Sequence, residues 1–242
     1  MNILEAIEKR KSRRSYLSTP IANDKIEKIE RLISKYNEEG NISIQLIEDG
    51  SQAFNGLRKS YGMFSGVKSI LALIGKSEDP HLSEKLGYYG ELLVLEATKL
   101  NLGTCWVGGS FDKKTPIGKL RDDESLVCVI PIGNVEETQT IKEKLIYKAA
   151  HGKTKAVEEF YTAVGEVPQW FSEGMKAVQK APSAKNTQKV RFNYNQGNIT
   201  AGIENTYVFD LIDLGIAKAH FAIVADGDFE FGNPGQFHKG KK

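Results

Sequence analysis

The sequence predicts a mixed α+β protein with two related halves in one chain. Two continuous apolar runs of strand length, residues 69–74 and 126–132, indicate buried strands. Two longer and mostly apolar segments, residues 83–100 and 210–225, have helical length and indicate central helices. These patterns place helices around strands in both parts of the chain, with the halves expected at residues 1–150 and 151–242.

The elements expected in the first half follow from periodicity, caps and breakers. Ile3, Leu4 and Ile7 predict a short helix that stops in a basic cluster. The next helix bears Ile26, Ile29 and Ile33; Asn23 or Asp24 caps it, and Gly40 ends it. A half-exposed strand at 42–46 and a helical stretch at 51–65 follow. The remaining elements are the strand at 69–74, the helix at 83–100 capped by Ser83, a short helix at 116–120 and the strand at 126–132.

The second half opens with an expected connector at 142–154 and a helix at about 155–164. Phe171, Met175 and Val178 share a helical face, and Pro182 stops that helix. A strand at 190–194, a turn at Gly197-Asn198, a weak strand at 203–208 and the helix at 210–225 complete the prediction.

An internal likeness supports the two halves. Residues 87–97, beginning Gly-Tyr-Tyr-Gly, resemble residues 215–225, beginning Gly-Ile-Ala-Lys, and each segment follows a strand region. A duplicated unit explains the likeness. The alternative, that buried helices of any origin look alike, remains open on this pattern alone.

Composition narrows the classes of function. The 242 residues are 40% hydrophobic and 26% charged, as in ordinary globular proteins, and the net charge of +2 is too small to indicate a nucleic-acid partner. The N-terminus lacks the apolar core of a signal peptide, and no apolar run approaches transmembrane length, so no membrane partner is expected. Cys105 and Cys128 lie in apolar surroundings, which indicates reduced, buried thiols in a cytoplasmic protein.

The segment Arg10-Lys11-Ser12-Arg13-Arg14-Ser15-Tyr16 clusters cations around small hydroxyls. Arginine suits bidentate contact with phosphate, and Ser12 can add a hydroxyl. Arg10 and Arg14 share a face if the first helix continues. The alternative is a solvated helix end with cations favoured by the helix dipole.

The segment Ala181-Pro182-Ser183-Ala184-Lys185-Asn186-Thr187-Gln188 is a polar turn that follows a helix. Its hydroxyl, side-chain amide and backbone N–H groups suit the edge of a flat heteroaromatic ring. Together with the cation cluster, it indicates a phosphate-bearing flavin. The alternative is a plain helix-ending turn, since Pro, Ser and Asn are common in turns.

A third segment, Gly103-Thr104-Cys105-Trp106-Val107-Gly108-Gly109, follows the first long helix. Its paired glycines allow a backbone to approach a planar ligand closely, or they serve a tight connection between packed elements. Other chemistries find no support: the four histidines and two cysteines show no metal-ligand spacing, so no metal is expected, and no Gly-x-Gly-x-x-Gly or Gly-x-Ser-x-Gly pattern occurs. His220 is expected to be a satisfied core histidine.

These segments resemble a known family. Residues 10–16 resemble the Arg-Arg-Ser-x-Arg-x-Phe opening of FMN-dependent nitroreductases, and residues 181–188 resemble their Ala-Pro-Ser-x-x-Asn-x-Gln-Pro segment. Residues 102–109 and Ile130-Pro131-Ile132-Gly133 resemble later blocks, and Lys142-Glu143-Lys144 matches a basic pair that commonly reaches the FMN phosphate. The likeness spans most of residues 3–235 and implies a nitroreductase-like mixed sheet flanked by helices.

The order of the blocks is unusual. Family members usually carry the Ala-Pro-Ser block soon after the arginine block, but here residues 35–40 lack it and it stands in the second half. The chain therefore resembles the single-chain, pseudo-dimeric subgroup, with one FMN expected at the junction of the halves. Lys11 replaces an arginine of the pattern, and Lys189-Val190 replaces its usual Pro-Trp, so the flank of the turn is expected to differ.

The resemblance implies roles for named residues. Arg10, Ser12, Lys142 and Lys144 are expected to hold the FMN phosphate, and Arg14 to lie nearer the ring. Lys11 is expected to be a further cofactor-binding residue. Gly108 and Gly109 are expected to supply backbone near flavin N5, and Pro182, Ser183 and Asn186 to contact the ring edge. Thr104, Val107 and Ala184 are expected to be further cofactor-binding residues. No side chain is assigned a catalytic role, because the flavin carries the chemistry.

The implied activity is that of an NAD(P)H oxidoreductase that reduces nitroaromatics, quinones or related small acceptors by ping-pong hydride transfer. The protein is expected to be a monomeric pseudo-dimer. Three alternatives remain: another flavin reductase or dehalogenase of the superfamily, a non-catalytic FMN-binding or storage protein, and a structural domain without cofactor. The sequence leaves the physiological acceptor, the preference between NADH and NADPH, and further oligomerisation undetermined.

Overall fold

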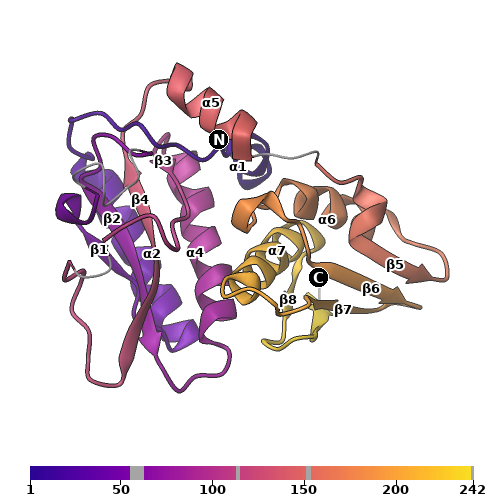
Figure 1. Cartoon of the computed structure of the whole chain (residues 1–242). Coiled ribbons are helices and arrows are strands. Elements are labelled where there is room, and N and C mark those ends of the chain that lie inside the picture. Colours follow the sequence, from indigo (N-terminus) through magenta and orange to yellow (C-terminus); the bar gives the residue numbers. More distant parts are fainter. Residues whose placement is uncertain (55–62, 113–114, 151–153, 241–242) are drawn as a thin grey trace. The chain divides into compact units, whose positions relative to one another are not determined.

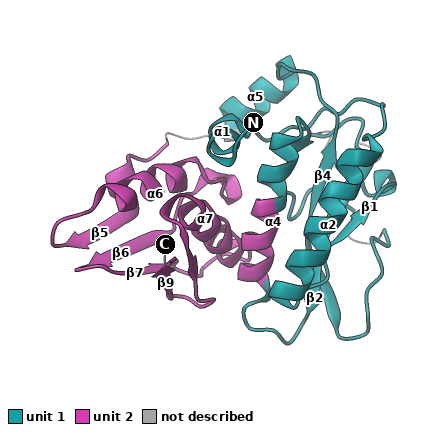
Figure 2. Cartoon of the chain, turned by 180° about the vertical axis from the view of Figure 1, so that it is seen from behind, with its two compact units in different colours: residues 1–82, 93–149 teal, residues 83–92, 150–242 magenta. Residues whose placement is uncertain are grey.

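The computed structural model describes residues 1–54, 63–112, 115–150 and 154–240 (Figure 1). The chain forms two compact units, coloured separately in Figure 2. Unit 1 comprises residues 1–82 and 93–149, and unit 2 comprises residues 83–92 and 150–242. Each unit places helices beside its own sheet, so the predicted α+β class is confirmed.

Unit 1 contains a four-stranded sheet in the order β1-β2-β4-β3, from β1 (Gln45–Ile47), β2 (Ser69–Lys76), β4 (Glu124–Gly133) and β3 (Gly103–Thr104). All three pairings are antiparallel, and β2 and β4 pair over their whole shared length with one irregularity between Leu73 and Ile74. Strand β2 is buried along its middle and β4 along its last six residues, because both faces of each apolar run are covered there. The two buried strands expected from the sequence are confirmed.

The helices of unit 1 are α1 (Ile3–Lys9), α2 (Asn23–Gly40), the second half of α4 (Leu82–Lys99) and α5 (Ile141–Ala150). Asn2 and Glu5 form a capping box that starts α1. Helix α2 buries Ile29 and Ile33, and Figure 1 shows α2 and α4 running along the sheet. On one sheet face, Ile70, Ala72 and Ile74 pack with loop side chains such as Phe54.

Unit 2 contains a five-stranded mixed sheet in the order β5-β6-β7-β9-β8, from β5 (Tyr161–Val164), β6 (Arg191–Asn195), β7 (Asn198–Gly202), β9 (Gly235–Lys239) and β8 (Gly227–Phe229). Only the β5–β6 pairing among these strands is parallel. Helices α6 (Gln169–Lys180) and α7 (Asp210–Ala225) pack on each other and on an aromatic core. That core includes Phe171, Phe192, Phe221, Phe229 and Phe237.

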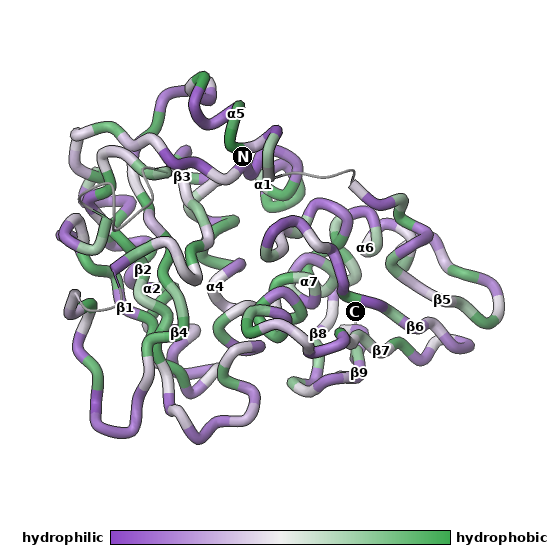
Figure 3. The backbone as a smooth tube through the Cα atoms, in the orientation of Figure 1, coloured by the Kyte–Doolittle hydropathy of each residue, from purple (hydrophilic) through white to green (hydrophobic). Residues whose placement is uncertain are grey.

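Helix α7 is buried along nearly its whole length, which Figure 3 shows as a largely hydrophobic segment. Its buried polar residues, Asp210, Asp213, Lys218 and His220, each have a hydrogen-bond or ion-pair partner in unit 2. Lys218 forms an ion pair with Glu84 at the start of α4, and His220 bonds to Glu91 at 2.9 Å and to the Ala177 carbonyl at 3.0 Å. The prediction that His220 is a satisfied core histidine is confirmed.

Two glycines allow α4 and α7 to approach closely. A Cβ on Gly215 would overlap the Glu84 carbonyl oxygen and lie 2.7 Å from the Tyr88 nitrogen. A Cβ on Gly87 would overlap the Ile212 carbonyl oxygen and lie 3.0 Å from the Ile212 carbonyl carbon. Each glycine thus meets the residue three positions before the other glycine, so the contact is reciprocal.

Several boundaries differ from the sequence-based expectations. The expected connector at 142–154 contains helix α5, and the expected helix at 155–164 is instead η2 (Val157–Phe160), a 3-10 helix, followed by β5. Residues 116–120 are not helical, and the last strands are β7, β8 and β9 rather than 203–208. Of the predicted helical stretch 51–65, residues 51–53 form η1 (Ser51–Ala53), a 3-10 helix, and residues 55–62 lie outside the described part.

The physical reason is that short segments take their conformation from their neighbours. Strand β5 exists because it pairs with β6 through residues 161–164 and 192–195, a partner that local periodicity does not encode. Helices α2 and α4 also start without the expected side-chain caps; Ala22 and His81 occupy their cap positions. Within the described residues, no helix combines the length and apolar character needed to cross a bilayer.

Candidate functional site

The basic segment of unit 1 is an extended chain rather than a continued helix. Helix α1 ends at Lys9, and Arg10 has an extended backbone with φ −55° and ψ 127°. Ser12 then forms a parallel bridge with Thr104, and Ser15 forms one with Ser65. The expectation that Arg10 and Arg14 share a helical face is therefore wrong, because sheet-like pairing with neighbouring strands replaces the helical bonds.

The buried side chain of Arg13 anchors this segment. Its side chain is buried and its Nε lies 3.1 Å from Glu143 Oε1. The guanidinium also donates to the carbonyl oxygens of Glu136 at 2.7 Å and Thr138 at 3.2 Å. The planar fork of arginine is therefore consumed by structural contacts. Arg13 anchors the cluster and leaves the ligand to its neighbours.

Glu143 is the other half of the anchor. Its carboxylate accepts the backbone N–H groups of Arg14 at 2.6 Å and Ser15 at 3.2 Å, and those of Thr140 at 2.8 Å. Burial alone would raise the pKa of Glu143, but these N–H donors and the Arg13 charge outweigh burial and hold its pKa at about 2. The carboxylate is thus ionised at neutral pH, and it fixes both the basic segment and the first turn of α5.

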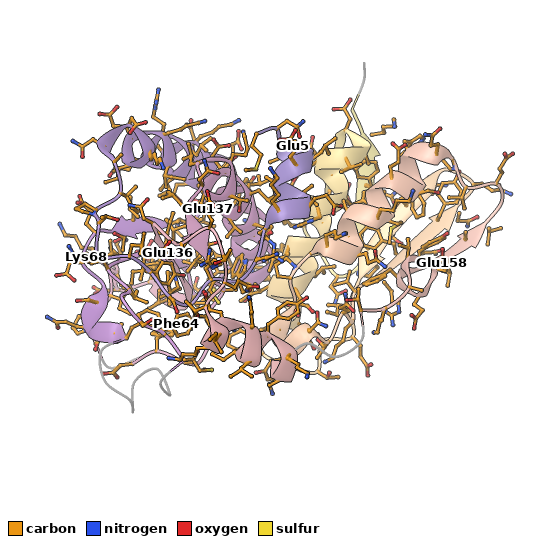
Figure 4. All side chains as sticks on the ribbon, turned by 90° about the horizontal axis from the view of Figure 1, so that it is seen from above. Glu5, Phe64, Lys68, Glu136, Glu137 and Glu158 are labelled. Atoms are coloured by element: carbon orange, nitrogen blue, oxygen red, sulfur yellow. The ribbon has the colours of Figure 1, made fainter. Side chains whose placement is uncertain are left out.

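Ser12 contacts a buried thiol on which the charges of Arg14 and Arg10 also act. Cys105 is hydrogen-bonded with Ser12 and lies within reach of the charges of Arg14 and Arg10; burial nevertheless raises its pKa. The Arg14 guanidinium lies 5.7 Å from the centroid of the Phe64 ring, which is labelled in Figure 4. Its Nε atom is buried and has no hydrogen-bond partner among the described residues. A buried, unused cationic donor indicates a missing anionic or carbonyl partner.

The remaining predicted phosphate contacts are exposed. Lys11 is exposed beside Ser12, and Lys142 and Lys144 are exposed on the first turn of α5. Because Glu143 between the two lysines bonds to the Arg14 and Ser15 backbone, that turn is docked on the basic segment. The structure thus brings Arg10, Ser12 and Arg14 together and places the turn bearing Lys142 and Lys144 beside them.

The glycine-containing loop begins at the same place. Thr104 is buried and its carbonyl accepts the Arg13 N–H at 2.8 Å. Val107 exchanges backbone hydrogen bonds with Val129 at 2.9 and 3.0 Å, so its N–H is already used. Gly108 is half-buried and Gly109 is exposed; a Cβ on Gly109 would meet no atom within 4 Å. Open space at Gly109 is what close approach of a planar ligand requires.

In unit 2, the predicted ring-edge segment is the turn from Pro182 to Gln188, which contains η3 (Ala184–Asn186), a 3-10 helix. Pro182, Ser183 and Ala184 are half-buried, and the Ser183 hydroxyl accepts the Gln188 N–H at 3.0 Å. Lys185 and Asn186 both have φ of 53°. Such left-handed backbone is unusual outside glycine and favours asparagine.

Asn186 carries the clearest sign of an absent partner in this turn. Its side-chain Nδ2 and the neighbouring Thr187 Oγ1 are buried and have no hydrogen-bond partner among the described residues. A buried amide donor without a partner costs about 1–3 kcal/mol, so native structures usually satisfy it with a ligand or water. The donor is suited to a carbonyl oxygen of a bound ring.

Arg13 and Glu143 anchor the candidate site, and sequence reasoning assigned no role to either of them. The sequence carried a signal for Glu143 but none for Arg13. Thr140-Ile141-Lys142-Glu143 has the Thr-x-x-Glu spacing of a capping box, which predicts a helix start at 141. Arg13 differs from Arg10 and Arg14 only in tertiary position, and no local pattern shows which of three neighbouring arginines is buried.

Several solved structures resemble this chain. A putative nitroreductase from Thermotoga maritima MSB8 has a similar structure, with a TM-score of 0.65 and 20% identity, covering 98% of this chain and 93% of that one. An FMN-dependent nitroreductase from Clostridium difficile R20291 has a TM-score of 0.45 and 19% identity over 62% of this chain and 98% of that one. A nitroreductase with bound FMN from Bacteroides fragilis NCTC 9343 has a TM-score of 0.46 and 16% identity, covering 58% of this chain and 92% of that one. No curated protein matches this chain.

The likeness over nearly the full length of the Thermotoga protein establishes a nitroreductase-like α+β fold. The model of the family described as "Putative TM nitroreductase" matches residues 2–225. The chain belongs to this family and is an oxidoreductase of the nitroreductase superfamily. The resemblance found in the sequence is therefore confirmed at the level of the family.

Proposed function

We propose that this protein is an FMN-dependent NAD(P)H oxidoreductase that reduces nitroaromatics, quinones or related acceptors. The observation that carries the proposal is a pair of buried donors, Arg14 Nε and Asn186 Nδ2, in the two segments that resemble FMN-binding motifs. Neither donor has a hydrogen-bond partner among the residues that the structure describes. FMN presents a phosphate and ring carbonyl oxygens, which are acceptors for such donors. The residues present therefore fit the cofactor.

In this proposal, Arg10, Lys11, Ser12, Lys142 and Lys144 hold the phosphate, and Arg14 contacts the ring. Glu143 pairs with Arg13 and accepts the Arg14 and Ser15 N–H groups, so its carboxylate does not engage the Arg14 guanidinium, which contributes its charge to the ligand. Thr104, Val107, Gly108 and Gly109 line the approach to the ring in unit 1. Pro182, Ser183, Ala184 and Asn186 of unit 2 contact its edge.

FMN, when bound, supplies hydride transfer from a nicotinamide to an acceptor. The chain's own contribution is to bind and to orient. A cation at Arg14 favours negative charge on a bound ring, and the buried Asn186 donor favours a carbonyl oxygen at its edge. The open space at Gly109 would leave room for substrates beside a bound ring.

We also propose that the chain is a fused pseudo-dimer that binds one FMN. The reciprocal contact of Gly87 and Gly215 supports related halves, since a two-fold axis makes residue i meet residue j while j meets i. These glycines open the two segments whose sequences resemble each other. A fused dimer accounts for both observations, and it needs no second chain.

The first test is an FMN titration of the purified protein followed by steady-state kinetics. We expect a flavin absorbance band at about one FMN per chain and oxidation of NADH or NADPH when a nitroaromatic or a quinone is added. FMN binding without turnover would overturn the enzymatic assignment and favour a storage protein. Protein that binds no FMN would overturn the cofactor assignment as well.

Two single substitutions test the two segments separately. Arg14→Ala should weaken FMN binding about 10- to 100-fold, because a hydrogen bond to a charged group contributes about 1.5–3 kcal/mol. Asn186→Ala should weaken it about 5- to 10-fold, as expected for a neutral hydrogen bond of about 1 kcal/mol. Fluorescence quenching of FMN measures both affinities.

Matched controls are Arg31→Ala on the exposed face of α2 and Asn195→Ala at an exposed position of β6. Both should bind FMN as the wild type does. If Asn186→Ala also binds normally while Arg14→Ala does not, the ring-edge role of residues 182–186 is wrong and the phosphate site stands alone.

A further inference from the structure

A buried carboxylate holds the turn that carries Asn186. Asp213, in the first part of α7, is 4% exposed. Its two oxygens accept the backbone N–H of Ala184 at 3.0 and 2.9 Å. Asp213 therefore connects a rigid, buried helix to the first residue of η3, two residues before Asn186.

This turn requires external support because its backbone is strained. Lys185, Asn186 and Gln188 all have φ near 50°, and each such non-glycine residue costs roughly 1 kcal/mol. Among the described residues, side chains support it at several points. The Ser183 hydroxyl accepts the Gln188 N–H at 3.0 Å, and the Gln188 side chain accepts the Lys155 N–H at 3.0 Å. The Lys155 ammonium donates to the Thr187 and Gln188 carbonyls at 3.2 and 2.8 Å, and Asp213 holds Ala184. Weakening one of them changes the conformation available to Asn186.

The charges around Asp213 are already partnered in other directions. Asp210 on the same helix bonds to Lys189 at 3.0 Å and to the Thr206 and Tyr207 N–H groups. On α4, Glu84 and Glu91 bond to Lys218 and His220. Burial raises the pKa of Asp213 to about 7; the Asp210 charge adds to this, while the Ala184 N–H and Lys189 oppose it.

We propose that Asp213 is a positioning residue for the ring-edge turn, and that FMN binds more tightly when this carboxyl is ionised. The inference rests on the proposed function, because it assigns regulation to the same site. An ionised acceptor makes a hydrogen bond roughly twice as strong as a neutral one, so the carboxylate holds Ala184 and the Asn186 donor in place. The neutral acid holds them less firmly and is formed as the pH falls below about 7.

The cofactor-free protein gives the first test. We expect the protection of the Ala184 amide against hydrogen exchange, corrected for intrinsic rates, to rise about fivefold between pH 5.5 and 8.5 in the wild type. Asp213→Asn keeps the shape and one acceptor oxygen but cannot ionise, so its protection should stay flat. Asp228→Asn, which removes an exposed carboxylate of β8, should behave as the wild type does.

The second test is FMN affinity over the same pH range. The FMN phosphate itself titrates near pH 6 in every variant, so the informative quantity is the ratio of wild-type to Asp213→Asn affinity. We expect this ratio to rise about fivefold through pH 7. A constant ratio, or one that falls with pH, would overturn the inference.

The two tests separate the inference from the proposed function. If the amide protection depends on Asp213 as expected but FMN does not bind, the turn is positioned by Asp213 and the flavin assignment fails. If FMN binds and turns over but neither the amide protection nor the affinity ratio changes with pH, the proposed function stands and the role of Asp213 is wrong.

Discussion

Gly215→Ala should destabilise unit 2 by about 3 kcal/mol, although the same change in an exposed helix stabilises it by about 1 kcal/mol. The added methyl would overlap the Glu84 carbonyl oxygen and lie 2.7 Å from the Tyr88 nitrogen. Both are backbone atoms of α4, so no side-chain rotation relieves the overlap. The steric cost therefore exceeds the gain in helix propensity, and the helices must move apart.

The measurement is the free energy of unfolding from denaturant titration of the full chain. Gly87→Ala should cost a similar amount, because the contact is reciprocal. Gly109→Ala is the matched control, since its methyl would meet no atom within 4 Å. If Gly215→Ala were neutral or stabilising, helix propensity would dominate and the close approach of α4 and α7 would be wrong.

Arg13→Ala should destabilise unit 1 by about 3–5 kcal/mol, which is the usual cost of removing one partner of a buried ion pair. The Glu143 carboxylate would keep its N–H donors but lose the cation, and the carbonyls of Glu136 and Thr138 would lose a donor. Arg13→Lys should recover only part of the loss, because an ammonium cannot reproduce the planar fork. Arg31→Ala on exposed α2 should change stability by less than about 0.5 kcal/mol.

The stability that Glu143 contributes through its pair with Arg13 should decrease as the pH falls. The pKa of Glu143 is about 2 in the folded protein and near its ordinary 4.5 when unfolded, so the folded state favours the ionised form. Its stabilisation is present above about pH 4.5 and is lost as the pH falls toward 2. Glu143→Gln should therefore flatten the acid limb of the stability profile. An unchanged limb would mean that Glu143 is not ionised in the folded protein.

Loss of FMN binding in Arg13→Ala is a separate expectation. Among the described residues, the Arg13 side chain bonds to Glu143 and to the Glu136 and Thr138 carbonyls. An effect of Arg13→Ala on FMN affinity would therefore act through the position of Arg14. Arg13→Ala should consequently weaken FMN binding less than Arg14→Ala does at a temperature where both variants are folded. The reverse order would make Arg13 the direct contact.

Long, strongly patterned elements were predictable from the sequence. The apolar runs that became β2 and β4, and the apolar segments that became α4 and α7, are extensive enough for burial to decide their conformation locally. The motif segments at 10–16, 102–109 and 181–188 also follow from sequence, because their resemblance to one family depends on residue type and spacing.

The long-range partners of short elements were not predictable from the sequence, and β5 and α5 show why. Residues 161–164 gain strand conformation from pairing with β6, and α5 starts at 141 because Glu143 caps it while bonding to a segment about 130 residues away. Neither partner is visible in a local window. Propensity alone gives such segments too small a preference to decide the outcome.

The sequence by itself determined the fold class, the family and which segments carry donors suited to a flavin. Only the tertiary structure decided how neighbouring residues divide their roles. Arg13 is buried against Glu143 while the Arg14 donor is left without a partner among the described residues, and Asp213 of α7 holds the turn that carries Asn186. The physical reason is that residue type sets what a group can bind, whereas burial and long-range partners set whether it is free to do so.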